Sequence, residues 1–289
     1  MLLPLLAAHI CEQNKDISTG QKKLKEAKNS VEESNKQIVA KDAEIKKLNT
    51  QIINSLVSLS AMFSAIPAVS VIIPVYNVEK YVGECLDSLV NQTFKDFEVI
   101  VVDDCSTDNS VAFVESYAPK FNGRLQVFKL SKKSIGGGGS LPRKKGLELS
   151  IGKYVFFLDA DDVITDTGLE ELYTIAEEFK ADVVHCEKFY KVPDKIWHDK
   201  LERGKLKAAN HFTPGRLDVT SPTPLSDDIS KRVEMFAEKK LIWNFWAQLI
   251  RRDFIVENEI TLPDAAAQDM LFTMCSICCA KKYVVVPNV

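Results

Sequence analysis

The sequence predicts an α/β fold in which a mostly parallel sheet is flanked by helices, with a long helix before it. From residue 69 onward, short apolar runs alternate with segments of helical spacing, which is typical of βαβ units. Residues 17–59 are instead polar, lack proline and carry an apolar residue at every seventh position. Since 289 residues exceed one average domain, we expect a helical or coiled-coil segment at 1–66 and an α/β domain at 67–289.

The N-terminal segment is regularly apolar at only one of the two positions per heptad that form a coiled-coil seam. Its companion positions, three residues further on, include Gly20, Ser34 and Lys41, which pack poorly against a partner helix. Weak self-association through this helix is one interpretation, and a polar helix lying against the domain is the other. The residues that form the seven-residue repeat are Ile17, Leu24, Val31, Ile38, Ile45, Ile52 and Leu59.

The α/β domain begins after Pro67. Runs rich in β-branched residues predict buried strands, and amphipathic spacing predicts the helices between them. We expect strands at 69–75, 97–102, 125–130, 154–158 and 182–185, and helices at 79–92, 110–117, 140–150 and 167–179. Residues 193–231 show little periodicity and predict a long loop, of the kind that often acts as a lid. Helical patterning resumes at 233 and continues to 250.

Composition argues against some classes of partner and indicates the cellular compartment. The net charge of -3, without a basic stripe, argues against nucleic acid as a partner. Residues 51–76 lack charge, but Pro67 and Pro74 interrupt them, so we do not expect an integral membrane protein. We expect a cytoplasmic protein, with peripheral contact at the inner face of the membrane as an alternative. The odd number of cysteines, seven, fits a reducing compartment better than a disulfide framework.

Cys275 and Cys278 form a C-x-x-C pair, which can indicate zinc or redox chemistry. No second pair of ligands follows at a suitable spacing. The surrounding residues, 270–280, have the pattern of an apolar helix, in which free cysteine behaves as a small hydrophobe. We therefore favour buried structural thiols over a metal site.

An acidic cluster, Asp159-Ala160-Asp161-Asp162, follows the fourth predicted strand. Ligands of open α/β sheets bind at the carboxyl ends of the strands, so these carboxylates are well placed for a site. Crowded carboxylates suit Mg²⁺ or Mn²⁺, which prefer oxygen ligands and substrate phosphates. The alternative is the N-terminus of a helix, where aspartate is also favoured.

Two further segments at strand ends are candidates for a nucleotide site. The motif Asp103-Asp104-Cys105-Ser106-Thr107-Asp108 could bond to base and ribose, or could be a polar turn that caps a helix. The run Gly136-Gly137-Gly138-Gly139 permits close approach of a ligand, or could be a flexible surface turn. It is not a Walker loop, because no G-K-[ST] follows. Basic residues that could contact phosphate flank it: Lys132, Lys133, Arg143, Lys144 and Lys145.

Three motifs in order resemble the family 2 glycosyltransferases, which have the GT-A fold. They are Val71-Ile72-Ile73-Pro74-Val75-Tyr76-Asn77, Val101-Val102-Asp103-Asp104-Cys105-Ser106-Thr107-Asp108, and Phe157-Leu158-Asp159-Ala160-Asp161-Asp162. The resemblance covers residues 69–289 and leaves out the N-terminal helix.

The resemblance implies a role for each matching residue. Pro74 and Tyr76 would line the base, with Tyr76 stacking on it, and Asp104 would accept a hydrogen bond from it. Arg143 would lie near the diphosphate, although Lys144 replaces the asparagine that usually follows. Asp161 would be the main ligand of Mn²⁺ or Mg²⁺; the other carboxylates assist, Asp162 at the metal and Asp159 at the ribose or sugar.

The resemblance also extends to an acidic pair before an apolar helix, matched here by Gln268-Asp269. Asp269 would be the general base that deprotonates the acceptor hydroxyl; the alternative is a helix N-cap. Gln268 replaces the usual glutamate, which affects acceptor binding more than the base. Trp243-Asn244 and Trp246 resemble the acceptor side.

The implied reaction is inverting transfer of a hexosyl or N-acetylhexosaminyl group from a nucleotide-sugar, most commonly a UDP-sugar, to a glycan or lipid-linked acceptor in polysaccharide synthesis. Because the chain stops at Val289, where family members usually continue, the alternative is an inactive fragment that binds a nucleotide or acts through its coiled coil. A nucleotidyltransferase would need a glycine-rich signature after the first strand, which is absent.

Overall fold

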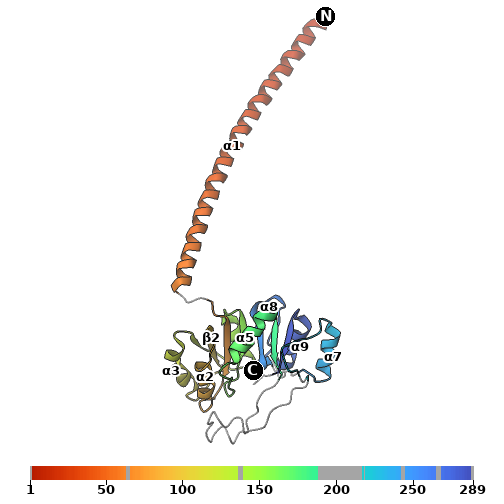
Figure 1. The fold of residues 1–289 in the computed structure, drawn as a ribbon. Coiled ribbons are helices and arrows are strands. Elements are labelled where there is room, and N and C mark those ends of the chain that lie inside the picture. The colour runs from red at the N-terminus through yellow and green to blue at the C-terminus, as the bar shows by residue number, and fades with distance from the viewer. Residues whose placement is uncertain are drawn as a thin grey trace. The chain divides into compact units, whose positions relative to one another are not determined.

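The computed structural model describes residues 2–62, 66–135, 139–187, 217, 219–241, 245–264 and 268–287, and within the first of these ranges it describes the side chains of 19–20 and 22–53. Contacts divide the chain into two units, Met1–Ala65 and Ile66–Val289. Figure 1 shows the elements of both units in order along the chain.

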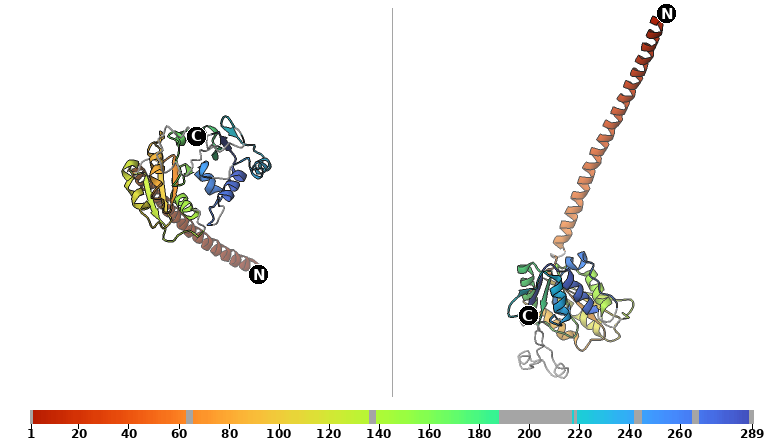
Figure 2. Two further views of the ribbon diagram at one scale, coloured as in Figure 1. Left: turned by 90° about the horizontal axis from the view of Figure 1, so that it is seen from below. Right: turned by 90° about the vertical axis from the view of Figure 1, so that its right-hand side faces the viewer.

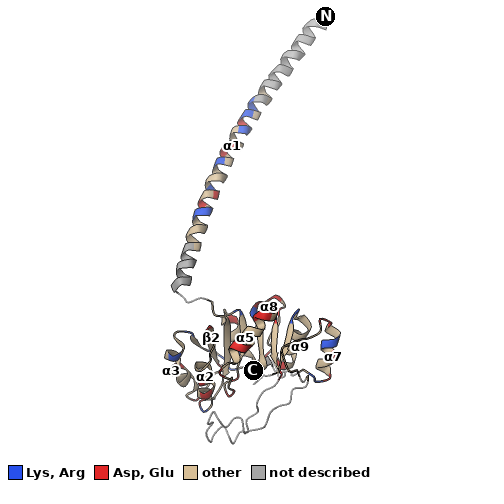
Figure 3. Ribbon diagram, viewed as in Figure 1, with Lys and Arg blue, Asp and Glu red and all other residues tan. Residues whose placement is uncertain are grey.

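The first unit is a single helix, α1 (Leu2–Met62). Basic and acidic residues are interspersed along its described part, as Figure 3 shows. The described members of the seven-residue repeat each expose more than half of their surface: Leu24 58%, Val31 59%, Ile38 55%, Ile45 53% and Ile52 53%. The predicted stripe therefore lies on a solvent-exposed face of α1. Among the described residues, no helix has both the length and the apolar character needed to cross a bilayer.

The second unit is built on one mixed sheet in the order β3-β2-β1-β4-β7-β5-β8-β6. Its strands are β1 (Val69–Val75), β2 (Phe97–Asp103), β3 (Leu125–Lys129), β4 (Tyr154–Phe157), β5 (Val183–Cys186), β6 (Thr223–Pro224), β7 (Gln248–Arg251) and β8 (Tyr283–Val286). Parallel pairing joins β1 to β2 and β4, β2 to β3, and β5 to β8. β7 pairs antiparallel with both β4 and β5, and β6 pairs antiparallel with β8. The predicted mostly parallel sheet is confirmed.

Helices cover both faces of this sheet, as the views in Figure 2 show. They are α2 (Val82–Val90), α3 (Ser110–Ser116), α4 (Ser140–Leu149), α5 (Gly168–Phe179), α7 (Ile229–Ala237), α8 (Arg252–Glu257) and α9 (Gln268–Cys279), with 3₁₀ turns η1 (Ala118–Phe121) and η3 (Phe245–Ala247). Residues of α2, α3 and α5 share one hydrophobic core, and residues of α4, α7, α8 and α9 share the other.

Alternation along the strands supplies both cores, because successive side chains of a strand point to opposite faces. Val71 and Ile73 of β1 belong to the core under α2, whereas Ile72 between them belongs to the core under α4. Helix α4 packs closely on β1 at Gly146, where a Cβ atom would lie 2.3 Å from Cγ2 of Ile72. Only glycine fits there, and this close approach brings the first turn of α4 toward the end of β1.

The segment 217–251 differs from its prediction. Residues 193–216 and 218 of the predicted loop lie outside the described residues, but its last part contains β6 and the start of α7. The predicted helix over 233–250 is confirmed for 233–237 and wrong for 248–250. α7 ends at Ala237, and β7 follows as a strand between β4 and β5. Pairing with two neighbouring strands decides the structure of residues 248–251, and this pairing overrides a local pattern that fits a helix.

Helix α9 matches the predicted apolar helix, but its thiols are more accessible than predicted. Cys275 and Cys278 are half-buried and Cys279 is exposed, and all are free. Among the described residues, no group of three or more His, Cys, Asp or Glu side chains is arranged to hold a metal ion.

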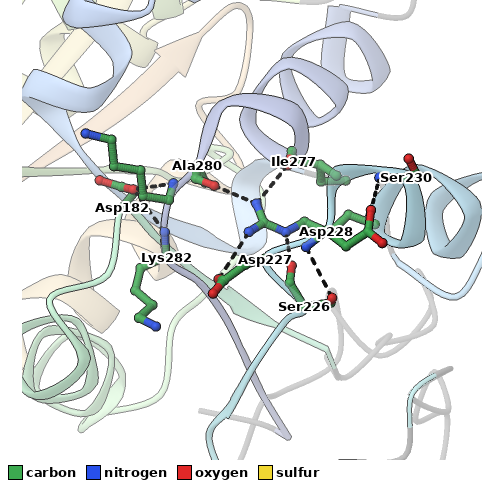
Figure 4. A network of polar contacts seen from close by, with 10 residues as sticks. Asp182, Ser226, Asp227, Asp228, Ser230, Ile277, Ala280 and Lys282 are labelled. Atoms are coloured by element: carbon green, nitrogen blue, oxygen red, sulfur yellow. Dashed lines mark hydrogen bonds and ion pairs between the residues drawn. The ribbon is translucent and has the colours of Figure 1, made fainter.

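Arg232 of α7 fastens the carboxyl end of α9 (Figure 4). Arg232 is 1% exposed, and its guanidinium donates hydrogen bonds to the carbonyl oxygens of Ile277 (3.2 Å) and Ala280 (2.5 Å), and to that of Ser226; Figure 4 labels these three partners. The last carbonyls of a helix have no partner within the helix, so a buried cation is well suited to them. Beyond the helix end, the Asp182 carboxylate accepts from the backbone N–H groups of Lys281 (2.8 Å) and Lys282 (3.1 Å). Helix α9 is thus fixed at the end opposite to Asp269.

We predict that Arg232→Met destabilises the second unit by about 3 kcal/mol, because it leaves buried carbonyl oxygens without donors. Urea denaturation of the full chain measures this difference. Lys231→Met is the matched control, since Lys231 is exposed on the same helix. Equal midpoints for the two variants would contradict the role of Arg232.

Candidate active site

A cavity of about 240 Å³ opens at the carboxyl ends of β1, β2 and β4. It includes all the residues that the sequence assigned to the nucleotide-sugar, namely Pro74, Tyr76, Asp104, Arg143, Asp159 and Asp161. The other lining residues are Val75, Val78, Lys133, Gly139, Pro142 and Ala160. Side chains that are far apart in the sequence therefore converge at the place where open α/β sheets bind ligands.

The loops after β1 and β2 are bonded to each other. Asn77, in the left-handed region at φ 52, donates its N–H to Oγ of Ser106 (3.0 Å) and accepts from the N–H of Thr107 at Oδ1 (2.8 Å). The Asp108 carboxylate accepts from the N–H of Glu79 (3.1 Å). The polar groups of 106–108 thus fasten one loop to the other, as expected of a polar turn. Within the motif 103–108, the cavity is lined by Asp104.

Asp104 is buried and held by the segment that follows β3. Its Oδ1 accepts from the backbone N–H of Ser134 (2.8 Å), and its Oδ2 accepts from the Ser134 hydroxyl. Each carboxylate oxygen has a second lone pair, so the group can still accept a hydrogen bond from a ligand. These bonds fix Asp104 in the wall of the cavity.

Tyr76 lies at the exposed rim of the cavity, with 40% of its surface accessible. The Lys133 ammonium lies over its ring, 3.7 Å from the centroid, a distance at which cation–π attraction operates. From the sequence, Lys133 is one of several basic residues beside the glycine run. Its position over the ring depends on the fold and has no local sequence signal. A base that stacks on this face of Tyr76 would have to displace Lys133.

Arg143 is drawn into the cavity wall by the first turn of α4. Gly139, at φ 71, precedes the helix, and a Cβ there would lie 2.9 Å from Nη1 of Arg143. Arg143 has an 8% exposed side chain and forms an ion pair with Asp159. A strong charge-assisted bond therefore joins α4 to the end of β4.

The acidic cluster forms a tight turn after β4. The N–H of Asp162 donates to the carbonyl of Asp159 (3.0 Å), and the Cys85 thiol of α2 donates to the same carbonyl (3.6 Å). Burial, together with the charges of Asp159 and Asp161, raises the pKa of Asp162 to about 7. Negative charge is thus in excess at this turn.

This donor set fits a hard divalent cation. Carboxylate oxygens are its preferred ligands, and a cation would offset the repulsion by Asp159 and Asp161 that, after burial, raises the Asp162 pKa. Mg²⁺ and Mn²⁺ usually take one or two carboxylates and complete their shell with water and phosphate. The described residues accordingly need not form a complete cage by themselves.

Asp269 lies in the first turn of α9 as its second residue. Burial raises its pKa, and the charges of Arg143, which lowers it, and Asp159, which raises it, also act on it. Asp269 therefore shares the electrostatic environment of the cavity although it does not line it. Gln268 is buried beside it, and Trp246 of η3 is partly buried against the core. Trp243-Asn244 lies outside the described residues.

Asp264 is a further residue that the sequence did not single out. Its carboxylate accepts from the backbone N–H of Ile135 (3.2 Å) and from the Ser140 hydroxyl (3.2 Å). These partners are more than 120 positions away along the chain, at separations of 129 and 124. No local pattern could have indicated them.

Comparison with known proteins identifies the family of the chain. The family model described as "Glycosyl transferase family 2" matches residues 70–225, which are more than half of the chain. The fold and the site define a nucleotide-diphospho-sugar transferase-like domain of the GT-A type. The chain belongs to glycosyltransferase family 2.

Curated relatives share about a third of their aligned residues with this chain. A poly(ribitol-phosphate) beta-glucosyltransferase of Bacillus spizizenii is 32% identical over 219 residues, covering 74% of this chain and 30% of the relative. The poly(ribitol-phosphate) beta-N-acetylglucosaminyltransferase TarS of Staphylococcus aureus is 32% identical over 209 residues, covering 71% and 31%. The chain thus spans about a third of the length of these relatives.

Solved structures of TarS residues 1–349 resemble the second unit. The complex with UDP has a TM-score of 0.62 and 28% identity, covering 76% of this chain and 58% of that one. The complex with UDP-GlcNAc has a TM-score of 0.61 and 29% identity. This likeness supports the GT-A fold predicted for residues 67–289.

Proposed function

We propose that this chain is an inverting, metal-dependent glycosyltransferase that moves a sugar from a UDP-sugar to a hydroxyl acceptor. One observation carries the proposal: every residue that the family resemblance assigned to the nucleotide-sugar lines one cavity at the strand ends. The TarS complexes with UDP and UDP-GlcNAc support UDP as the nucleotide.

Donor binding is assigned to residues of the cavity wall. Asp104 accepts a hydrogen bond from the base, and Tyr76 and Pro74 pack beside it. Arg143 faces the negative charge of the diphosphate, for which a buried guanidinium is well suited. Asp159 orients Arg143 through their ion pair and lies near the ribose or sugar.

Asp161 is proposed as the main ligand of Mn²⁺ or Mg²⁺, with Asp162 assisting. A cation bound there supplies charge stabilisation to the leaving diphosphate. The two carboxylates provide the oxygen donors, and the excess negative charge at the turn favours a cation over water.

Asp269 is proposed as the general base. Its carboxylate accepts the proton of the acceptor hydroxyl, and the freed oxygen forms a bond to the anomeric carbon as the bond to the diphosphate breaks. Attack opposite to the leaving group inverts the anomeric centre. Partial burial suits this role, because a raised pKa makes Asp269 a stronger base than an ordinary aspartate.

The acceptor is proposed to be a hydroxyl-bearing polymer or lipid-linked glycan, and the transferred group a hexosyl or N-acetylhexosaminyl unit. Both curated relatives described above are named for transfer to poly(ribitol-phosphate). Such a role places the chain in polysaccharide synthesis, in the cytoplasm or at the inner face of the membrane.

We predict that the full chain binds UDP and hydrolyses a UDP-sugar in the presence of Mn²⁺, and that Asp161→Ala lowers the Mn²⁺-dependent rate about 100-fold or more, because the metal site loses its main ligand. A panel of nucleotide-sugars with and without Mn²⁺ measures this. Asp166→Asn is the control, since Asp166 is exposed outside the cavity.

A rate that needs neither Mn²⁺ nor Asp161 would contradict the transferase proposal. UDP binding without turnover on any donor or added acceptor would favour the alternative, a non-catalytic nucleotide-binding protein.

We predict that Asp269→Asn lowers kcat for transfer by about 100-fold or more, while the dissociation constant for UDP changes little. Because the Asp269 pKa is raised, the protonated, inactive form persists to higher pH than for an ordinary aspartate. The fall of kcat/KM toward acidic pH should therefore begin at a higher pH in wild type than it would with an ordinary aspartate as the base. The part of this fall that belongs to Asp269 should be absent from the residual rate of Asp269→Asn. An unchanged pH profile in the variant would exclude Asp269 as the base.

We further propose that α1 associates weakly with a second copy through its exposed seven-residue stripe. Sedimentation of the full chain should then give a larger, concentration-dependent mass, and a chain without residues 1–66 should sediment as a monomer. Ile38→Lys and Ile45→Lys together should abolish the difference, whereas Lys36→Ala on the same helix should not. Equal masses with and without residues 1–66 would refute the association.

A further inference from the structure

Asp264 lies on the segment between α8 and α9, five residues before Asp269. Buried Ile260 (5% exposed) and Leu262 (3%) anchor this segment in the core under α9. Asp264 itself is on the exposed side, where its carboxylate can reach the other half of the site.

Both carboxylate oxygens of Asp264 are used. Oδ2 accepts from the backbone N–H of Ile135 and Oδ1 accepts from the Ser140 hydroxyl, each at 3.2 Å. In the sequence these partners stand on either side of the glycine run 136–139. One side chain therefore holds both ends of that run.

The two held residues adjoin the walls of the nucleotide cavity. Ser134, next to Ile135, donates two hydrogen bonds to Asp104. Gly139, next to Ser140, lines the cavity beside Arg143. Displacing either end of the run would thus move a group that contacts the proposed donor.

We propose that Asp264 is a positioning residue that fastens Ile135 and Ser140 to the segment between α8 and α9, and so holds the nearby walls of the cavity in the arrangement that binds the nucleoside diphosphate. This inference rests on the proposed function of the cavity. It adds a role for a residue that touches neither the cavity nor the reacting atoms.

The chemistry of the side chain makes the role testable. An aspartate offers two acceptor oxygens, whereas an asparagine offers one, because its amide nitrogen only donates. Asp264→Asn therefore removes one of the two contacts, and Asp264→Ala removes both. Since Asp264 and Ile135 are exposed, neither change should unfold the domain.

The test measures UDP affinity by calorimetry in Mn²⁺, the donor KM and kcat, and the thermal midpoint of the full chain. We expect Asp264→Ala to raise the UDP dissociation constant and the donor KM about 5- to 10-fold, a change equivalent to about one net hydrogen bond, because the two lost contacts act on UDP only through the positions of Ser134 and Gly139. We expect a smaller rise for Asp264→Asn, and the thermal midpoint should stay at the wild-type value in both. Asp253→Asn, an exposed aspartate of α8, is the matched control and should bind UDP as wild type does.

A double-mutant cycle isolates the contact. Ser140→Ala should weaken UDP binding alone but add little in the Asp264→Ala background, because both changes remove the same bond. Full additivity, or UDP affinity unchanged in both Asp264 variants, would overturn the positioning role and leave the proposed function intact. A fall in thermal midpoint parallel to the loss of affinity would also overturn it in favour of a structural role. Failure of the wild type to bind UDP would overturn the proposed function, and this inference with it.

Discussion

Burying the Arg143 guanidinium beneath the start of α4 requires an anion beside it, and Asp159 supplies one from the end of β4. The pair joins two elements that carry different parts of the cavity, and it acts over a short distance in a partly desolvated place, where charge attraction is strong. It also aligns the acidic turn, because Asp159 is the first residue of that turn. The charge of Asp269 in α9 responds to both members of the pair. The donor wall, the acidic turn and the proposed base are therefore linked electrostatically through this one contact.

The packing that positions these groups can be predicted from the sequence for some strands and not for others. The strands β1, β2 and β4 could be predicted because they are buried on both faces and consist largely of apolar residues. Strand β7 could not be predicted, because it has four residues and is stabilised by antiparallel neighbours on both sides. Its four residues, of which the first three are buried, are too few to be distinguished from one turn of a helix. Tertiary pairing, which is absent from any local window, decided that element.

The residues of the candidate site show the same difference between local and tertiary signals. Tyr76, Asp104 and Asp161 could be proposed from sequence because they belong to motifs that resemble a known family, and strand direction brings the ends of those motifs to one edge of the sheet. Lys133 and Asp264 could not, because their positions depend on contacts between distant segments. Conversely, Ser106 and Thr107 had the right chemistry for a ligand but are engaged in bonding to the loop after β1. A hydroxyl beside a strand end is as useful for fixing a loop as for binding substrate, and only the fold distinguishes the two uses.

Charge balance explains why donor binding and metal binding should be coupled here. The cavity wall carries three carboxylates, Asp104, Asp159 and Asp161, and two cationic side chains, Lys133 and Arg143. Asp159 already neutralises most of the charge of Arg143, and Lys133 lies over the ring of Tyr76 at the rim. A diphosphate entering this wall would therefore meet a net negative potential around Asp161, and its binding would be opposed. A divalent cation held by Asp161 would reverse the sign of that potential and would offer coordination sites to phosphate oxygens. The same carboxylates that would repel the donor alone would thus favour binding of the donor together with a cation. This charge balance supports the proposal of a metal-dependent site over a site that relies on cationic side chains alone.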